Sequence, residues 1–187
     1  LVVWVVELIL GFLGGAISRN APVIGFLFRL LEYAVGLFFQ MNLIKIALEI
    51  FDGRPARLED LFTIPAHWLS YLIAGIIVGI VVGIGFVIFI IPGLYMLARW
   101  LFYGYAIVDR GANATDSLGV SWQMTSGHVL GMILLVVALL VINLIGALIF
   151  GVGLLISAPV SLMAVTYAYR TLQRPAESVR AEELSYR

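Results

Sequence analysis

Long apolar runs separated by short polar breaks dominate the chain. The hydrocarbon core of a bilayer requires about 20 mainly apolar residues in a helix, because a backbone in lipid must satisfy its own hydrogen bonds. Six runs reach or approach that length, at residues 1–18, 22–50, 66–90, 94–108, 129–150 and 154–170. The pattern therefore predicts an all-α fold, a polytopic membrane helical bundle with about six transmembrane helices.

These runs pair into three hairpins whose turns on one side are short, at residues 19–22, 91–93 and 151–153. The larger polar segments all lie on the opposite side. Basic residues gather near those larger segments: Lys45, Arg54, Arg57, Arg110, Arg170, Arg174, Arg180 and Arg187. By the positive-inside rule, the large loops and both termini are expected to be cytoplasmic, in a multi-pass membrane protein.

The longest polar stretch within the chain covers residues 109–128. Asn113, Thr115 and Asp116 are candidate N-caps for a short helix there, and Trp122 is a candidate interfacial anchor. We predict one transmembrane helical domain over residues 1–173, with 109–128 as a cytoplasmic interfacial segment. Residues 174–187 alternate in charge and are predicted to form a polar, solvated cytoplasmic tail.

Four charged residues fall inside the predicted spans. At about 1.5 Å of rise per residue, Glu7 and Glu32 lie roughly 15 Å deep, and Arg29 and Arg99 roughly 10 Å deep, with Asn143 at a similar level. These five residues are predicted to form an intramembrane polar cluster. Two interpretations stay open: the cluster joins helices structurally, or it lines a polar cavity for a headgroup, a solute or protons.

Small residues at four-residue spacing predict close helix packing. Gly75, Gly79 and Gly83 share one face of the third span, which favours a packing seam within the chain over an oligomer interface. Ser157 and Ser161 suggest a second seam on the last span.

Composition narrows the chemistry further. The chain of 187 residues is 63% apolar and 12% charged with a net charge of zero, so nucleic-acid binding is not expected. It contains no cysteine, and its two histidines, His67 and His128, show no recognised metal-ligand spacing. Motifs of nucleophilic, nucleotide-binding or zinc-dependent enzymes are absent from the sequence. We therefore predict no metal site, no cofactor, no catalytic residue and no enzyme activity.

Three segments carry a family resemblance: Ile91-Pro92-Gly93-Leu94-Tyr95, Val108-Asp109-Arg110, and the stretch from Ser121 to Gly127. In this order they resemble bacterial polytopic inner-membrane proteins of unknown function, similar to the membrane domain of glycerophosphoryl diester phosphodiesterases. The resemblance implies an α-helical domain of the bacterial inner membrane and supplies no catalytic residues.

The expected function is that of a non-enzymatic structural or accessory subunit of a membrane protein assembly. Its expected partners are membrane lipids and either other membrane proteins or further copies of the chain. The alternative is a small transporter or lipid-handling protein that uses the charged layer of Glu7, Arg29, Glu32 and Arg99.

Overall fold

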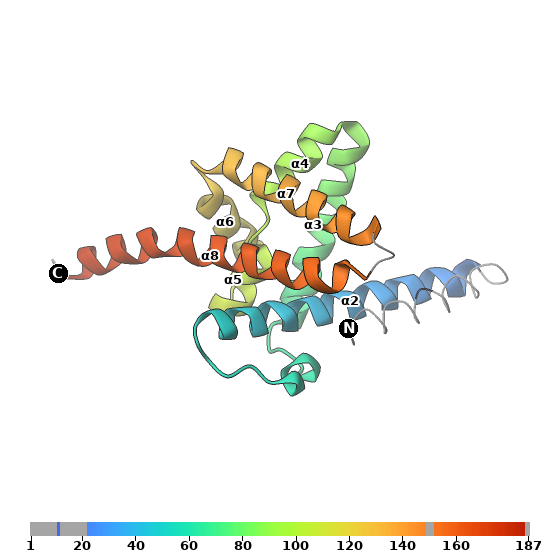
Figure 1. Ribbon diagram of the computed structural model, residues 1–187, viewed down its shortest axis with the longest axis horizontal. Helices are drawn as coiled ribbons and strands as arrows, with labels where there is room; N and C mark the ends of the chain where they lie inside the picture. The colour runs from blue at the N-terminus through green and yellow to red at the C-terminus, as the bar shows by residue number, and fades with distance from the viewer. Residues whose placement is uncertain (1–10, 12–21, 149–151, 186–187) are drawn as a thin grey trace.

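A computed structural model describes residue 11 and residues 22–148 and 152–185 (Figure 1). The helices are α2 (Pro22–Phe51), the short 3₁₀ helix η1 (Leu58–Phe62), α3 (Trp68–Ile88), α4 (Ile90–Arg99), α5 (Tyr103–Arg110), α6 (Ala114–Thr125), α7 (Val129–Leu148) and α8 (Leu154–Ser185). These ranges contain no strand. The predicted all-α helical fold is confirmed.

Three of these helices, α2, α3 and α7, are long and apolar enough to cross a membrane. They coincide with the second, third and fifth predicted spans, and they indicate a membrane protein. The first predicted span lies outside the described residues except for Gly11.

The predicted fourth span is broken into α4 and α5 at residues 100–102. The break leaves the carbonyl of Arg99 and the N–H of Phe102 in need of partners. Ser121 of α6 supplies both, because its Oγ accepts from the Phe102 N–H at 3.1 Å and donates to the Arg99 carbonyl at 2.9 Å. Broken helices persist in apolar surroundings where neighbouring side chains satisfy the freed backbone groups.

The turn between α3 and α4 lies at Phe89, whose backbone is extended, rather than at residues 91–93 as predicted. Pro92 instead occupies the first turn of α4, where a helix needs no N–H donor and tolerates proline. The two helices approach closely beyond the turn: a Cβ placed on Gly85 would lie 2.8 Å from the Cα of Gly93.

The predicted interfacial helix is α6. Its N-cap is Asn113, whose side chain accepts the Asp116 N–H at 2.9 Å, as the sequence predicts. Its buried face consists of Ser117, Ser121 and Thr125, spaced four residues apart. A stripe of hydroxyl groups therefore joins α6 to the rest of the bundle.

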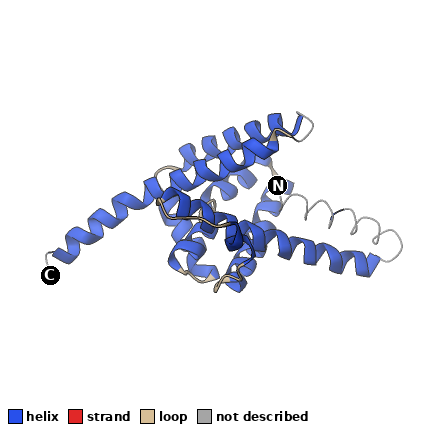
Figure 2. Cartoon of the chain, turned by 60° about the horizontal axis from the view of Figure 1, so that its bottom comes forward, coloured by secondary structure: helices blue, strands red, loops and turns tan. Residues whose placement is uncertain are grey.

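The core lies where the second half of α2 packs against α3, α5 and α8, and Figure 1 shows α2 and α8 side by side. Its buried members are Leu37, Met41, Ile44, Leu48, Tyr71, Ala74, Phe102, Tyr105, Ile107 and Tyr169. α7 pairs with the first half of α8, whereas the last part of α8 projects away from the bundle (Figure 2). The segment predicted as a polar tail thus continues α8 as helix to Ser185.

Candidate functional site

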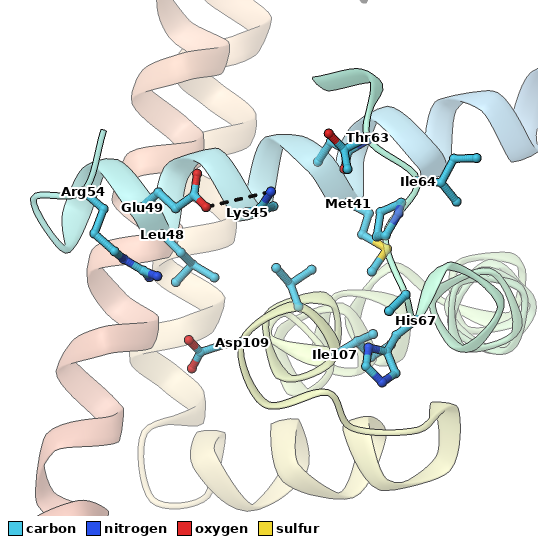
Figure 3. Close-up of a pocket in the computed structure, with 14 residues that line it drawn as sticks. Met41, Lys45, Leu48, Glu49, Arg54, Thr63, Ile64, His67, Ile107 and Asp109 are labelled. Carbon is cyan, nitrogen blue, oxygen red and sulfur yellow. Dashed lines mark ion pairs between the residues drawn. The ribbon is translucent and has the colours of Figure 1, made fainter. Parts of the chain in front are cut away.

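A pocket of about 470 Å³ lies between the second half of α2, the loop that follows it, and the end of α5 (Figure 3). Its lining residues are Met41, Asn42, Lys45, Leu48, Glu49, Arg54, Thr63, Ile64, Pro65, Ala66, His67, Ile107, Val108 and Asp109. In Figure 3, Arg54 and Asp109 lie at one end, and Thr63, Ile64 and His67 at the other. The volume is typical of small-molecule sites.

Helical spacing explains the polar side of the pocket. Asn42, Lys45 and Glu49 follow one another at intervals of three and four residues, so they share a face of α2. The loop returns over this face through η1, because the Asn42 amide donates to the Leu61 carbonyl at 2.9 Å. One helix face and one loop therefore position the polar groups of the pocket.

Lys45 is held by acids on both sides. Its Nζ lies 3.1 Å from an oxygen of Asp60 and 3.9 Å from Oε1 of Glu49. The hydrogen bond from Lys45, together with one from the Arg57 N–H, lowers the pKa of Asp60 below its ordinary value. Asp60, beside the pocket, is therefore held in its ionised form next to Lys45.

Two acceptor oxygens in the pocket residues lack a hydrogen-bond donor. Oδ1 of Asn42 and Oε2 of Glu49 are buried without a partner among the described residues. The bond from Nδ2 to Leu61 fixes the orientation of the Asn42 amide, so Oδ1 cannot exchange places with a donor. Buried polar atoms normally have partners, which makes these two oxygens candidate contacts for a bound donor group.

An ion cluster lies behind the pocket and joins three helices. Oδ2 of Asp109 accepts from Tyr169 at 3.0 Å, from Arg170 at 3.0 Å and from Gln173 at 2.8 Å. Arg170 also reaches Asp52 at the end of α2 at 2.6 Å. Asp109, the last residue but one of α5, is therefore held by three side chains of α8.

The polar residues predicted to form one intramembrane cluster do not gather at one place among the described residues. Arg99 ends α4 and is 5% exposed. Its Nη1 donates to the hydroxyls of Thr125 and Ser126 at 3.3 and 3.2 Å, and its guanidinium stacks on Trp122 at 3.8 Å. Its neighbours are thus the hydroxyls and the indole of α6 rather than Glu32.

The charges of α2 lie apart from Arg99. Arg29 is exposed and Glu32 half-buried in the first half of α2, and a Cβ on Gly11 would lie 3.2 Å from Oε1 of Glu32. The described residues hold no ion pair between Arg29 and Glu32. Glu7 lies outside the described residues.

Asn143 links α7 to α8 instead of joining charged residues. Its amide donates to Ser161 at 2.8 Å, and its Oδ1 accepts from Ser157 at 2.9 Å. Ser157 and Ser161, which the sequence indicates as a second seam, therefore meet Asn143 across the hairpin.

The three glycines of the predicted seam have different surroundings. A Cβ on Gly75 would lie 3.1 Å from Leu37, and one on Gly79 would lie 3.4 Å from the Tyr33 hydroxyl. A Cβ on Gly83 would meet open space. The close face of α3 toward α2 thus includes Gly75 and Gly79 but does not extend to Gly83.

The two histidines occupy separate positions. His67 lines the pocket and packs on Gly111, where φ is +64° and a Cβ would lie 3.2 Å from Cε1 of the imidazole. His128 is exposed before α7. The described part of the chain contains no cluster of three His, Asp or Glu side chains able to hold a metal ion.

Sequence reasoning used Lys45 and Asp109 only as markers of topology and resemblance, and it omitted Asn42 and Glu49. The signal was present, because polar residues at positions 42, 45 and 49 interrupt an otherwise apolar run with helical spacing. The loop that returns over this face was not foreseeable from that spacing.

Three helices long and apolar enough to cross a membrane, together with a pocket of mixed polar and apolar lining, indicate an all-helical membrane protein with a candidate small-molecule site. Residues 73–181 match a family described as a domain of unknown function, DUF7847. This match covers more than half of the chain, and the chain belongs to that family.

Two bacterial relatives align with a longer part of the chain than the family does. The chain is 30% identical over 162 residues to the uncharacterized protein Rv2560 of Mycobacterium tuberculosis and 29% identical to the uncharacterized protein Mb2590 of Mycobacterium bovis. Each alignment covers 86% of this chain and 50% of the relative, so the chain spans about half the length of the curated relatives it matches. No solved structure matches the chain. The resemblance to bacterial proteins of unknown function is confirmed.

Proposed function

We propose that the chain is a non-enzymatic, membrane-spanning binding module, whose pocket takes a small zwitterionic molecule with a primary ammonium group. The observation that carries the proposal is the pair of buried acceptor oxygens, Oδ1 of Asn42 and Oε2 of Glu49. An ammonium group supplies three donors and a positive charge, which suits the carboxylate oxygen of Glu49. The amide oxygen of Asn42, about two helical turns earlier on α2, suits a second donor of the ligand.

The other charges of the pocket favour an anionic group on the same ligand. Lys45 and Arg54 contribute positive charge, and 58% of the Arg54 side chain is exposed. A ligand with an ammonium at one end and a phosphate or carboxylate at the other would contact both sets of residues. The headgroup of an ethanolamine phospholipid and a free amino acid both have this chemistry.

The hydrogen bonds around the pocket favour binding over catalysis. Nucleophilic catalysis requires a nucleophile within reach of a base. The hydroxyl of Thr63, the one Ser or Thr side chain among the described lining residues, donates to the Glu59 carbonyl at 3.4 Å, and Asp109 accepts from three donors. These groups are therefore engaged with structural partners.

The test compares two headgroups of equal charge, one with an ammonium group and one with a bulkier trimethylammonium group that has no N–H donor. Purified protein in detergent is titrated with phosphoethanolamine and with phosphocholine, and the thermal midpoint and the heat of binding are measured. Phosphoethanolamine is expected to bind and to raise the midpoint, because a ligand that binds only the folded state stabilises it. Phosphocholine has no N–H donor and is expected to have a smaller effect.

Two variants test whether phosphoethanolamine binds in the pocket. Glu49→Gln removes the negative charge at nearly constant volume and is expected to weaken phosphoethanolamine binding about tenfold or more. Glu59→Gln is the matched control, because Glu59 is an exposed carboxylate outside the pocket lining. Equal binding of both headgroups, or equal binding by wild type and Glu49→Gln, would contradict the proposal.

An accessory role in a membrane assembly is proposed beside this binding function. Only 17% of the apolar window of α7 is buried, against 39% for α2, so the outer face of α7 is available to lipids, to partner helices or to further copies of the chain. We place the module in the bacterial inner membrane with both termini cytoplasmic, as the distribution of basic residues favours. The likeness to the membrane domain of glycerophosphoryl diester phosphodiesterases stays a prediction.

The accessory role is tested by gentle extraction of native membranes, followed by a native gel and mass spectrometry. Migration within a defined large complex would support an accessory subunit. Migration alone or with lipid only would contradict the accessory role and leave the binding module as the function.

A further inference from the structure

A second polar site lies where α4, α6 and the start of α7 meet, and it is centred on Arg99. Arg99 is only 5% exposed, yet no carboxylate of the described residues lies within 4 Å of its guanidinium. Its Nε is buried without an acceptor. Arg170 provides the contrast within the same molecule, because it contacts two carboxylates, Asp52 and Asp109.

The neighbours of Arg99 do not neutralise its charge. Thr125 and Ser126 offer neutral hydroxyls to Nη1, and the Trp122 ring offers a cation–π contact at 3.8 Å. A buried cation normally has an anionic partner, because removal from water is costly without one. The site therefore has the character of an anion site.

Two further observations and a general property of helices indicate where the anion would lie. Ser126, whose hydroxyl is 3.2 Å from Nη1, is exposed and lies just before the first turn of α7. The first N–H groups of a helix have no intrahelical partner and attract anions. A Cβ on Gly127 or Gly131 would meet open space, so the start of α7 is uncovered.

We propose that Arg99 and the first turn of α7 bind the phosphate of an anionic phospholipid. Guanidinium groups bind phosphate oxygens in a two-pronged geometry that suits this ligand. The assignment to a lipid rather than free phosphate rests on what surrounds the site. Tyr95, Trp100 and Trp122 form an aromatic cluster of the kind found at headgroup depth.

The same helix offers a surface for the acyl chains. Leu130 and Leu134 follow the first turn of α7 and are 71% and 61% exposed. A lipid with its phosphate at Arg99 could therefore lay its chains along α7. The binding function proposed for the pocket of α2 does not depend on this site, because the two share no residue.

The experiment measures lipid retention by native mass spectrometry of the purified protein in detergent. Wild type is expected to bind dioleoyl phosphatidylglycerol about tenfold or more tightly than dioleoyl phosphatidylcholine. Arg99→Gln is expected to lose that preference, because it removes the charge. Arg57→Gln is the control, because it removes an exposed arginine that belongs to neither proposed site. An unchanged preference in Arg99→Gln would overturn the proposal.

If Arg99→Gln does not fold, a second variant tests lipid binding at this site. Gly131→Leu fills the open space at the start of α7 without entering the core, and it is expected to weaken phosphatidylglycerol binding several-fold. Unchanged binding by that variant would overturn the proposal. Inorganic phosphate at millimolar concentration separates the two sources of the anion: displacement of the lipid would overturn the lipid assignment, whereas retention supports it.

Discussion

The charged base of the bundle and its hairpin tips are stabilised in opposite ways. The charged base, defined by Lys45, Glu49, Asp52, Asp109 and Arg170, carries ion pairs beside a core of buried aromatic residues. The hairpin tips are the start of α2, the α3–α4 turn and the α7–α8 turn. Large apolar side chains there face outward, up to 88% exposed at Val87.

The difference shows which interactions can specify a fold in lipid. Apolar contact between helices gains little there, because lipid tails are as apolar as the side chains they replace. The tips are therefore held by close backbone approach, as at Gly85 and Gly93 or at Gly146 and Gly153. The charged base is held by polar partners whose loss leaves a charge unsatisfied.

The largest expected effect is on the ion cluster of the charged base. Arg170→Met leaves Asp109 and Asp52 without their main cation, and breaking a buried pair costs about 3–5 kcal/mol. Because the Arg170 and Asp109 side chains are each 17% exposed, we expect a loss near the lower limit of that range. The free energy of unfolding, measured by denaturant titration in mixed micelles, checks this value.

Val87→Ala is the matched control at a tip, and its effect is expected to stay within about 0.5 kcal/mol. Similar losses for Arg170→Met and Val87→Ala would mean that the charged base and the tips do not differ in the way described above.

A somewhat smaller effect is expected at the break between α4 and α5. Ser121→Ala removes the acceptor of the Phe102 N–H and the nearer of the two hydroxyls that donate to the Arg99 carbonyl, the other being that of Thr125 at 3.3 Å. Leaving buried backbone groups unpaired costs about 1–3 kcal/mol, which denaturant titration can measure. Thr115→Ala is the control, because it removes an exposed hydroxyl from the first turn of the same helix. Equal losses in the two variants would contradict the role given to Ser121.

Glycine substitutions test whether close backbone approach stabilises the hairpin tips. A Cβ on Gly146 would lie 2.7 Å from Oγ of Ser157 and 3.0 Å from the backbone of Gly153, so Gly146→Ala forces α7 and α8 apart. Overpacking of this kind costs about 1–3 kcal/mol, and we expect a loss within that range because Gly146 is buried against the backbone of the next helix. Gly83→Ala enters open space and is expected to be neutral or slightly stabilising. Thermal unfolding of both variants in detergent measures the difference, which would vanish if the hairpin could separate freely.

The sequence determines the apolar spans and the N-cap at Asn113 because these depend on local patterns. The long-range contacts between helices cannot be predicted from local sequence patterns. Arg99 and Glu32 lie at comparable predicted depth, but depth does not say which helices are neighbours, and the break at residues 100–102 turns Arg99 toward α6. The pocket likewise depends on a loop that returns over α2, whereas its polar helix face is visible in the spacing of Asn42, Lys45 and Glu49.

The smallest expected effect is a pH dependence in the loop of the charged base. The pKa of Asp60 is lowered chiefly by the hydrogen bond from Lys45, so the folded state binds a proton there less readily than the unfolded state. The stabilisation by this pair is present above the ordinary Asp pKa of about 3.9 and is lost as the pH falls through the lower pKa of the folded state. Thermal midpoints of wild type and Asp60→Asn, compared from pH 7 to pH 3, isolate Asp60 from the other carboxylates. The two thermal midpoints should differ slightly at neutral pH, and the difference should be smaller at high salt. They should converge as the pH is lowered. A difference that widened toward low pH would show that the ion pair between Lys45 and Asp60 does not hold this loop against α2.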